Sequence, residues 1–269
     1  RARLRRPGER GRLPAGAPQG SGAAFRESLS VDVSQDFAQI FERIYVINLD
    51  SRPDRLRGLE AQLKRVGLSL DGDFVRRLSA VRPAAQGDWP SIGALGCFMS
   101  HLEALRAAEA DGIGSLCIVE DDLDFTPAFL ADPAPYLEAL KARDWRLFHG
   151  GETREVTRAV PFRALALRPE EVLNCTHLVG FRGEAIGEAR RFLEAVASRP
   201  AGDPEGGPMH VDGAYYTFRG RRPEFPMLTF EPPMGMQRPS ASDVSPAWHD
   251  RLPFLRRGLA VARRLRQAF

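Results

Sequence analysis

The sequence contains few cysteines and almost no lysine. Its three cysteines, Cys97, Cys117 and Cys175, are not closely spaced, so they form neither a zinc-binding pattern nor a disulfide framework. Each has apolar neighbours, which favours buried free thiols in a reducing compartment. Only Lys64 and Lys141 are lysines among the 38 basic residues. With abundant Ala, Gly and Pro, this arginine bias indicates a GC-rich coding sequence rather than a nucleic-acid-binding surface.

Long apolar runs are also missing. No uninterrupted apolar stretch approaches the ~20 residues of a membrane span. The basic N-terminal residues are not followed by an apolar segment, so we predict no secretory signal and expect a cytoplasmic protein. The formal net charge is only +3, and the basic excess is concentrated at the two ends of the chain.

The composition, with 43% hydrophobic and 27% charged residues in a chain of 269, is that of a globular protein with a sizeable core. Residues 1–36 are rich in Arg, Gly and Pro and are expected to be a disordered basic tail. Residues 37–250 are expected to form the folded domain. Residues 251–269 alternate apolar residues with arginines, which predicts a basic amphipathic helix. It either contacts an anionic membrane surface from the cytoplasm or packs on its own domain.

Strands and helices alternate in the first half of the expected domain. Strand patterns at 43–49, 74–81 and from 115 onward are separated by helical patterns at 55–66 and 92–110. This order predicts an α/β fold with a mostly parallel, Rossmann-like sheet flanked by helices. Further on, the patterns predict helices at 127–143 and 184–198, and strands at 145–148, 176–181 and near 225–230. We expect irregular structure over 152–169 and a loop around Asp212.

The third strand ends abruptly in carboxylates. Side chains two apart in an extended chain share a side, so Glu120, Asp122 and Asp124 are expected to point one way and Asp121 the other. Ligands of open α/β sheets bind beyond the carboxyl ends of the strands. Carboxylates crowded there suit Mg²⁺ or Mn²⁺. The alternative is a solvated acidic turn that caps the next element.

Several short motifs resemble, in order and spacing, those of the family 25 glycosyltransferases. This family includes bacterial lipooligosaccharide galactosyltransferases and, more distantly, the collagen-modifying galactosyltransferases. The resemblance covers roughly residues 41–244 and leaves out both basic ends. The matching pieces are residues 45–50 with Arg52, Asp54 and Arg55, residues 93–97 with Ser100 and His101, residues 119–122, Thr176 and His177, Val211 and Asp212, and Gln237 with Ser242 and Asp243.

The resemblance implies a GT-A-like fold. It also implies an enzyme that transfers a sugar from a UDP-sugar to a hydroxyl, with inversion at the anomeric carbon. Residues 120–122 would then serve as the acidic metal motif, with Asp122 as the principal ligand of Mn²⁺ or Mg²⁺ and Glu120 beside it. Arg52 or Arg55 would pair with the diphosphate, unless both form salt bridges with Asp50 and Asp54. The expected donor-binding residues are Asn48, Leu49, Arg52, Arg55, Ser100, His101, Glu120 and Asp121.

Inversion by direct displacement needs a base that takes the proton of the acceptor hydroxyl. Asp212 is our candidate, with Asp243 and His149 as weaker ones. Alternatively, Asp212 is a second metal ligand or caps its loop. On the acceptor side, the resemblance points to Thr176, His177, Gln237 and Asp243.

The sequence therefore predicts a metal-dependent glycosyltransferase. Its expected partners are a UDP-sugar donor, with galactose as the expected sugar, and a glycan or lipid-linked glycan acceptor of the cell envelope, such as lipopolysaccharide or lipooligosaccharide. Nucleic acid is not an expected partner, because the aromatic residues follow the pattern of the core rather than a basic face. Two alternatives stay open: a metal-dependent phosphohydrolase of a nucleotide or phosphosugar, and a non-catalytic protein that binds a UDP-sugar.

Overall fold

A computed structural model describes residues 32–70, 72–152, 160–172 and 174–238. Asp243, most of the expected N-terminal tail and the expected C-terminal helix lie outside these residues. The helices are α1 (Val33–Ile40), α2 (Pro53–Arg65), α3 (Ile92–Ala110), α4 (Pro127–Ala131), α5 (Ala134–Ala142), α6 (Ala185–Ser198) and α7 (Val211–Arg221). The strands are β1 (Arg43–Asn48), β2 (Val75–Ser79), β3 (Ser115–Glu120), β4 (Leu123–Phe125), β5 (Leu147–His149), β6 (Gly151–Glu152), β7 (Arg163–Leu167), β8 (Leu178–Arg182), β9 (Met227–Glu231) and β10 (Gly235–Gln237).

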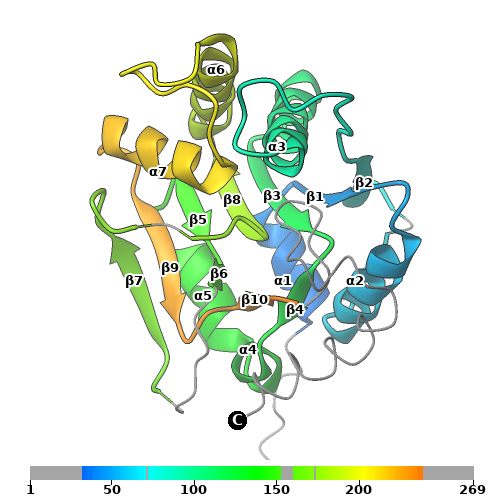
Figure 1. Cartoon of the computed structure of the whole chain (residues 1–269). Helices are drawn as coiled ribbons and strands as arrows, with labels where there is room; N and C mark the ends of the chain where they lie inside the picture. The colour runs from blue at the N-terminus through cyan, green and yellow to red at the C-terminus, as the bar shows by residue number, and fades with distance from the viewer. Residues whose placement is uncertain (1–31, 71, 153–159, 173, 239–269) are drawn as a thin grey trace, which may run out of the picture. The chain divides into compact units, whose positions relative to one another are not determined.

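The larger sheet has seven strands in the order β2-β1-β3-β8-β5-β9-β7 (Figure 1). The strand β1 pairs in parallel with both β2 and β3, and β5 pairs in parallel with β9. The strands β8 and β7 run antiparallel to their neighbours. The predicted α/β class, with a mostly parallel sheet flanked by helices, is confirmed.

A smaller sheet extends from the end of β3. Its central strand β10 pairs antiparallel with β4 and parallel with β6. Because β4 follows β3 after a two-residue turn, the chain leaves the larger sheet at Glu120 and enters the smaller one at Leu123. Residues late in the sequence are thereby brought beside the acidic turn.

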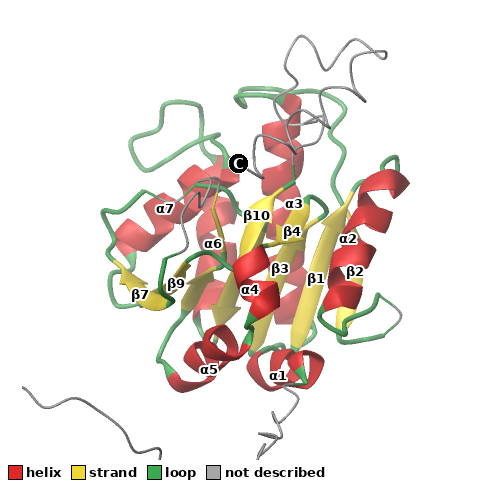
Figure 2. Cartoon of the chain, turned by 90° about the horizontal axis from the view of Figure 1, so that it is seen from below, coloured by secondary structure: helices red, strands yellow, loops and turns green. Residues whose placement is uncertain are grey.

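Each face of the larger sheet is covered by its own hydrophobic core. Alternate residues of the strands point to opposite faces, so Tyr45 and Ile47 join one core while Ile44 and Val46 join the other. Helices α3, α6 and α7 pack on the first face, and α1, α2, α4 and α5 on the second. Both views show helices on the two sides of the strands (Figures 1 and 2).

Several local predictions need correction. Residues 211–221 form helix α7, not the expected loop around Asp212. The helical pattern at 127–143 is divided into α4 and α5, because Pro133 cannot continue a preceding helix. Helix α1 begins at Val33, inside the expected tail, where the Asp32 side chain accepts a hydrogen bond from Gln35 N and caps it.

Helix α3 has the predicted bounds, and Ser91 caps its first turn by accepting from Ala94 N. The helix is buried on more than one side, since Ser100 and His101 are buried together with Phe98 and Leu102. No helix within the described residues has the length and apolar character to cross a membrane.

Candidate active site

A cleft of about 290 Å³ opens at the carboxyl ends of β1 and β3. The connection from β1 to β2 passes through α2 on one face of the sheet, and that from β2 to β3 through α3 on the other. The chain therefore diverges between β1 and β3, the place where open α/β sheets bind ligands. The cleft is lined by Ile47, Asn48, Leu49, Ser51, Arg55, Ala80, Val81, Arg82, Pro83, Ile92, Gly93, Gly96, Cys97, Ser100, Glu120 and Asp121.

The cleft thus brings together most of the residues that the sequence predicted on the donor side. Only Arg52 and His101 of that set are not in its lining. Arg52 instead forms a two-pronged pair with Asp54, at 3.1 Å and 3.0 Å. His101 is fully buried just behind the cleft.

The loop after β2 is held against α3 by Gly96 and Ser100. The Ser100 hydroxyl accepts a hydrogen bond from Val81 N (2.8 Å) and donates one to Gly96 O (2.6 Å). A Cβ atom on Gly96 would lie 2.8 Å from the Val81 carbonyl oxygen, so only glycine allows this approach. Ser100 therefore has a structural task at the wall of the cleft, in addition to its predicted place beside the donor.

The acidic residues do not alternate as an extended strand would make them. Strand β3 ends at Glu120, and Asp121 and Asp122 form a turn before β4. Glu120 contacts residues of α3 and of the segment before β8, whereas Asp121 and Asp122 both turn toward Arg55 of α2. Asp122, the expected principal metal ligand, is only 4% exposed and lies outside the lining of the cleft.

Arg55 holds the two aspartates together. Its Nη1 donates to Asp121 Oδ1 at 2.9 Å and its Nη2 donates to Asp122 Oδ2 at 3.0 Å. Asn48 Nδ2 donates to the other oxygen of Asp121 at 2.7 Å, and Gln237 Nε2 to Asp122 Oδ2 at 3.2 Å. One oxygen, Asp122 Oδ1, is buried without a hydrogen-bond partner among the described residues.

Burial raises the pKa of the Asp121 carboxyl, against the lowering effect of Arg55 and of the Asn48 hydrogen bond. Burial also raises the pKa of Asp122, and the nearby charge of Glu120 adds to the effect. Both carboxyls thus resist ionisation more than a free aspartate does.

Glu120 has a different environment. Its Oε1 accepts a hydrogen bond from the Thr176 hydroxyl at 2.6 Å and lies 3.3 Å from His101 Nε2. Burial alone would raise the pKa of Glu120, but His101 and Thr176 outweigh burial and lower it to about 2. On the far side of the imidazole, His101 Nδ1 lies 3.2 Å from the Tyr215 hydroxyl.

A possible metal-binding group does occur at this site, in a form that the sequence reasoning did not foresee. Cys97, His101 and Glu120 each offer a ligand atom, and these atoms lie within 4.8 Å of one another. Glu120 was among the predicted metal ligands, whereas Cys97 was expected to be only a buried thiol. The signal that could have revealed it is the spacing of Cys97 and His101, four residues apart on one helix face.

Asp212, the predicted base, lies in the first turn of α7 with its Oδ1 accepting from Gly213 N at 2.8 Å. The Asp212 carboxylate acts electrostatically on Cys97. Burial raises the pKa of the Cys97 thiol, and Glu120, Asp122 and Asp212 raise it further.

His149, a weaker candidate base, is buried and lies within hydrogen-bonding distance of the carbonyl oxygens of Asn174 and Cys175. Burial lowers the pKa of His149.

Two of the acceptor-side predictions, Thr176 and His177, fall on buried residues. Thr176 is 4% exposed and His177 is 1% exposed. His177 packs so closely on Gly151 that a Cβ there would meet its Nε2 at 2.0 Å. Gln237 lies on β10 and contacts Asp122. Thr176 donates to Glu120 at the end of β3, and the exposed Gln237 donates to Asp122 in the acidic turn.

Arg238 is a residue at the site that the sequence reasoning missed. Its guanidinium pairs with Asp124 at 2.7 Å and donates to the carbonyl oxygens of Leu123 (3.0 Å) and Asp121 (3.4 Å). It also fills the space above Gly58 of α2, where a Cβ would lie 2.3 Å from Nη1. Its distance along the chain from the acidic residues left no local pattern to find.

Neither a protein-family model nor a curated protein sequence matches the chain. Several solved structures are distantly similar to the chain, among them these two. One is a glycosyltransferase involved in the glycosylation of the major capsid of PBCV-1, with 8% identity and a TM-score of 0.38 over 74% of this chain and 93% of the other. The second is A197 from STIV, with 12% identity and a TM-score of 0.32 over 69% and 78%. Likeness this distant does not show membership of family 25, which stays a prediction from the motifs.

Proposed function

We propose that this protein is an inverting glycosyltransferase whose nucleotide-sugar donor binds in the cleft at the ends of β1 and β3. The observation that supports this most is the lining of the cleft. Asn48, Leu49, Arg55, Glu120 and Asp121, which come from distant motifs, meet there around one space. A polar wall of this kind beside apolar residues suits a nucleotide.

The proposed donor is a UDP-sugar, with UDP-galactose as the first choice. The acceptor hydroxyl would attack the anomeric carbon as the bond to the UDP oxygen breaks, and its proton would pass to the Asp212 carboxylate. The proposed acceptor is a glycan of the cell envelope, such as lipopolysaccharide. The enzyme would work at the cytoplasmic face of the membrane, with residues 251–269 in contact with the lipid.

A Mn²⁺ or Mg²⁺ ion belongs to this proposal. The buried Asp122 Oδ1, which has no hydrogen-bond partner within the described residues, is a fitting oxygen ligand. Glu120 would be its second carboxylate. When bound, such an ion neutralises charge on a diphosphate leaving group. Arg55 would orient both aspartates, because its guanidinium is committed to their oxygens.

The test is calorimetric binding of a panel of UDP-sugars, with and without Mn²⁺, beside an assay of UDP release. We expect one UDP-sugar to bind in a metal-dependent manner and UDP release to stay slow until an acceptor is added. Glu120→Gln should weaken donor binding at least tenfold. Glu103→Gln, on the exposed side of α3, is the matched control and should not alter it.

Two results would contradict the proposal in different ways. Rapid metal-dependent release of UDP or phosphate without any acceptor would identify a phosphohydrolase. Binding of a UDP-sugar without turnover on any glycan acceptor would favour a non-catalytic binding protein. If a folded sample binds no UDP-sugar at all, the cleft serves another ligand.

A further inference from the structure

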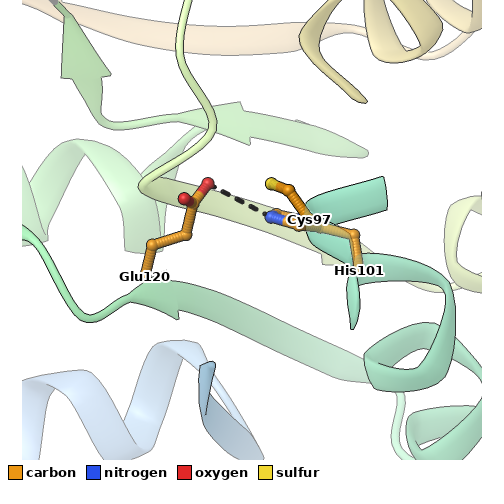
Figure 3. A group of neighbouring side chains, drawn as sticks. All are labelled: Cys97, His101 and Glu120. Atoms are coloured by element: carbon orange, nitrogen blue, oxygen red, sulfur yellow. Dashed lines mark hydrogen bonds and ion pairs between the residues drawn. The ribbon is translucent and has the colours of Figure 1, made fainter. Parts of the chain in front are cut away.

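Cys97, His101 and Glu120 surround one point beside the cleft. Figure 3 shows the Cys97 sulfur and the His101 imidazole of α3 directed toward the Glu120 carboxylate at the end of β3. One sulfur, one nitrogen and one oxygen atom lie within 4.8 Å of one another. We propose that these three side chains bind a divalent transition metal of the Zn²⁺ type. This site goes beyond the proposed function, because it would exist whether or not the cleft binds a sugar nucleotide.

The chemistry of the three ligands selects the metal. Thiolate, imidazole and carboxylate together are the ligands of Zn²⁺. Mg²⁺ and Mn²⁺ prefer oxygen atoms and have little affinity for a thiolate. The metal proposed here therefore differs from the Mn²⁺ or Mg²⁺ expected at Asp122.

The spacing of the nitrogen and oxygen ligands suits a tetrahedral ion. Metal–ligand bonds of about 2.0–2.2 Å at tetrahedral angles separate a nitrogen and an oxygen ligand by about 3.4 Å. His101 Nε2 and Glu120 Oε1 are 3.3 Å apart. That distance is long for a hydrogen bond, which is commonly about 2.9 Å. It is close to the edge length of the coordination tetrahedron.

Neighbouring groups orient the ligands before any metal arrives. The Thr176 hydroxyl donates to Glu120, and the second ring nitrogen of His101 lies beside the Tyr215 hydroxyl. Metal-binding histidines characteristically form such a contact through the nitrogen that does not bind the metal. Tyr215 is only 3% exposed, so it holds the imidazole rigidly.

The surrounding charge favours a cation. Glu120, Asp122, Asp212 and Asp121 all lie close enough to Cys97 to act on it electrostatically. On binding, the Cys97 thiol would lose its proton to solvent, and the metal–sulfur bond would form. Cys97 and Glu120 both line the cleft, so a fourth coordination position would open into it. Three protein ligands and one open position are the arrangement of catalytic rather than structural zinc sites.

The experiment uses the full-length, untagged protein after treatment with a chelator. Co²⁺ is added as the probe, and the near-ultraviolet charge-transfer band of a cobalt–thiolate bond is recorded. We expect one equivalent of Co²⁺ to produce the band and Zn²⁺ to displace it. Cys97→Ser should abolish the band, and Glu120→Gln should weaken Co²⁺ binding by at least tenfold.

Cys175→Ser is the matched control, because this partly exposed cysteine is not in the group, and it should leave the band intact. Tyr215→Phe, which removes only the hydroxyl beside His101, should weaken binding by about 10–100-fold. A folded sample that gives no thiolate band would overturn the proposal, as would a band that persists in Cys97→Ser. Since no sugar nucleotide is present, failure here is separate from failure of the proposed function.

Discussion

Two arginine–carboxylate networks in this chain share their chemistry but differ in burial. Arg55 with Asp121 and Asp122 lies at the end of β3, with side chains that are 13%, 8% and 6% exposed. Arg106 bridges Glu103 of α3 and Glu194 of α6 at 2.8 Å on both sides, with an exposed fraction of 42%. Water screens the second network more than the first, so similar distances carry unequal energies.

The two networks also respond to protonation in opposite directions. Hydrogen bonds from Arg106 and Arg190 lower the pKa of Glu194, whereas burial raises the pKa of Asp121. A lowered pKa means that the ionised carboxylate stabilises the fold. A raised one means that ionisation costs stability. Ionisation of the buried Asp121 thus lowers the stability of the fold. Such a cost is common where charged groups serve a functional site rather than the fold.

Breaking the buried network should produce the largest effect. Arg55→Met leaves two buried carboxylates without their counter-charge, so the free energy of unfolding should fall by about 3–5 kcal/mol. Urea denaturation followed by circular dichroism measures this. A loss under about 1 kcal/mol would show that water reaches the aspartates and that the two networks are alike.

Arg238→Met tests the smaller sheet's contribution to the same turn. The substitution removes charged hydrogen bonds to Asp124 and to two carbonyl oxygens, and should cost about 1.5–3 kcal/mol. The methionine keeps the apolar stem over Gly58. If the unfolding midpoint does not change, the strand β10 holds the turn by backbone pairing alone.

The change of stability with pH should have opposite signs for the two networks. The folded pKa of Asp121 lies above its ordinary value of 3.8, so the folded state binds more protons than the unfolded state between those two values. Relative to Asp121→Asn, the wild type should lose stability as the pH rises through this window. Unfolding curves for both proteins between about pH 4 and pH 7 test this. An opposite slope would mean that Arg55 outweighs burial.

The smallest effect is expected from Arg106→Ala. Exposed ion pairs typically contribute about 0.5 kcal/mol each, so the loss of both pairs should lower the free energy of unfolding by about 1 kcal/mol at most. The same urea titration provides the measurement. A loss as large as that of Arg55→Met would remove the contrast between the networks.

Much of the fold was predictable because local patterns determined it. The spacing of the apolar residues predicted the bounds of α3, and the run of β-branched residues predicted β1. Helix α7 escaped prediction because Gly213 and a preceding proline-rich stretch resemble a loop, and only packing of Tyr215 and Phe218 into the core makes it helical. The antiparallel direction of β8 depends on pairing with β3, which no local pattern contains.

The site was predictable in part for the same reason. The motif order located Asn48, Glu120 and Asp121, and these meet in the cleft. Their side-chain partners were not predictable: Arg55 is separated from Asp121 by 66 positions along the chain. Spacing in the sequence shows which residues share a helix face, but contacts across the fold decide which carboxylate is open to a ligand.

The attachment of β10 to the acidic turn has a consequence for how the protein is made. Asp122 accepts hydrogen bonds from Arg55 of α2 and from Gln237 of β10, and Arg238, the residue after β10, donates to the Asp121 carbonyl oxygen of the turn. During synthesis, the β1–α2–β2–α3–β3 segment leaves the ribosome well before these residues do. The cleft can therefore form its walls early, but its carboxylates reach their final arrangement only after residue 238 has emerged, which makes the site one of the last parts of the domain to mature.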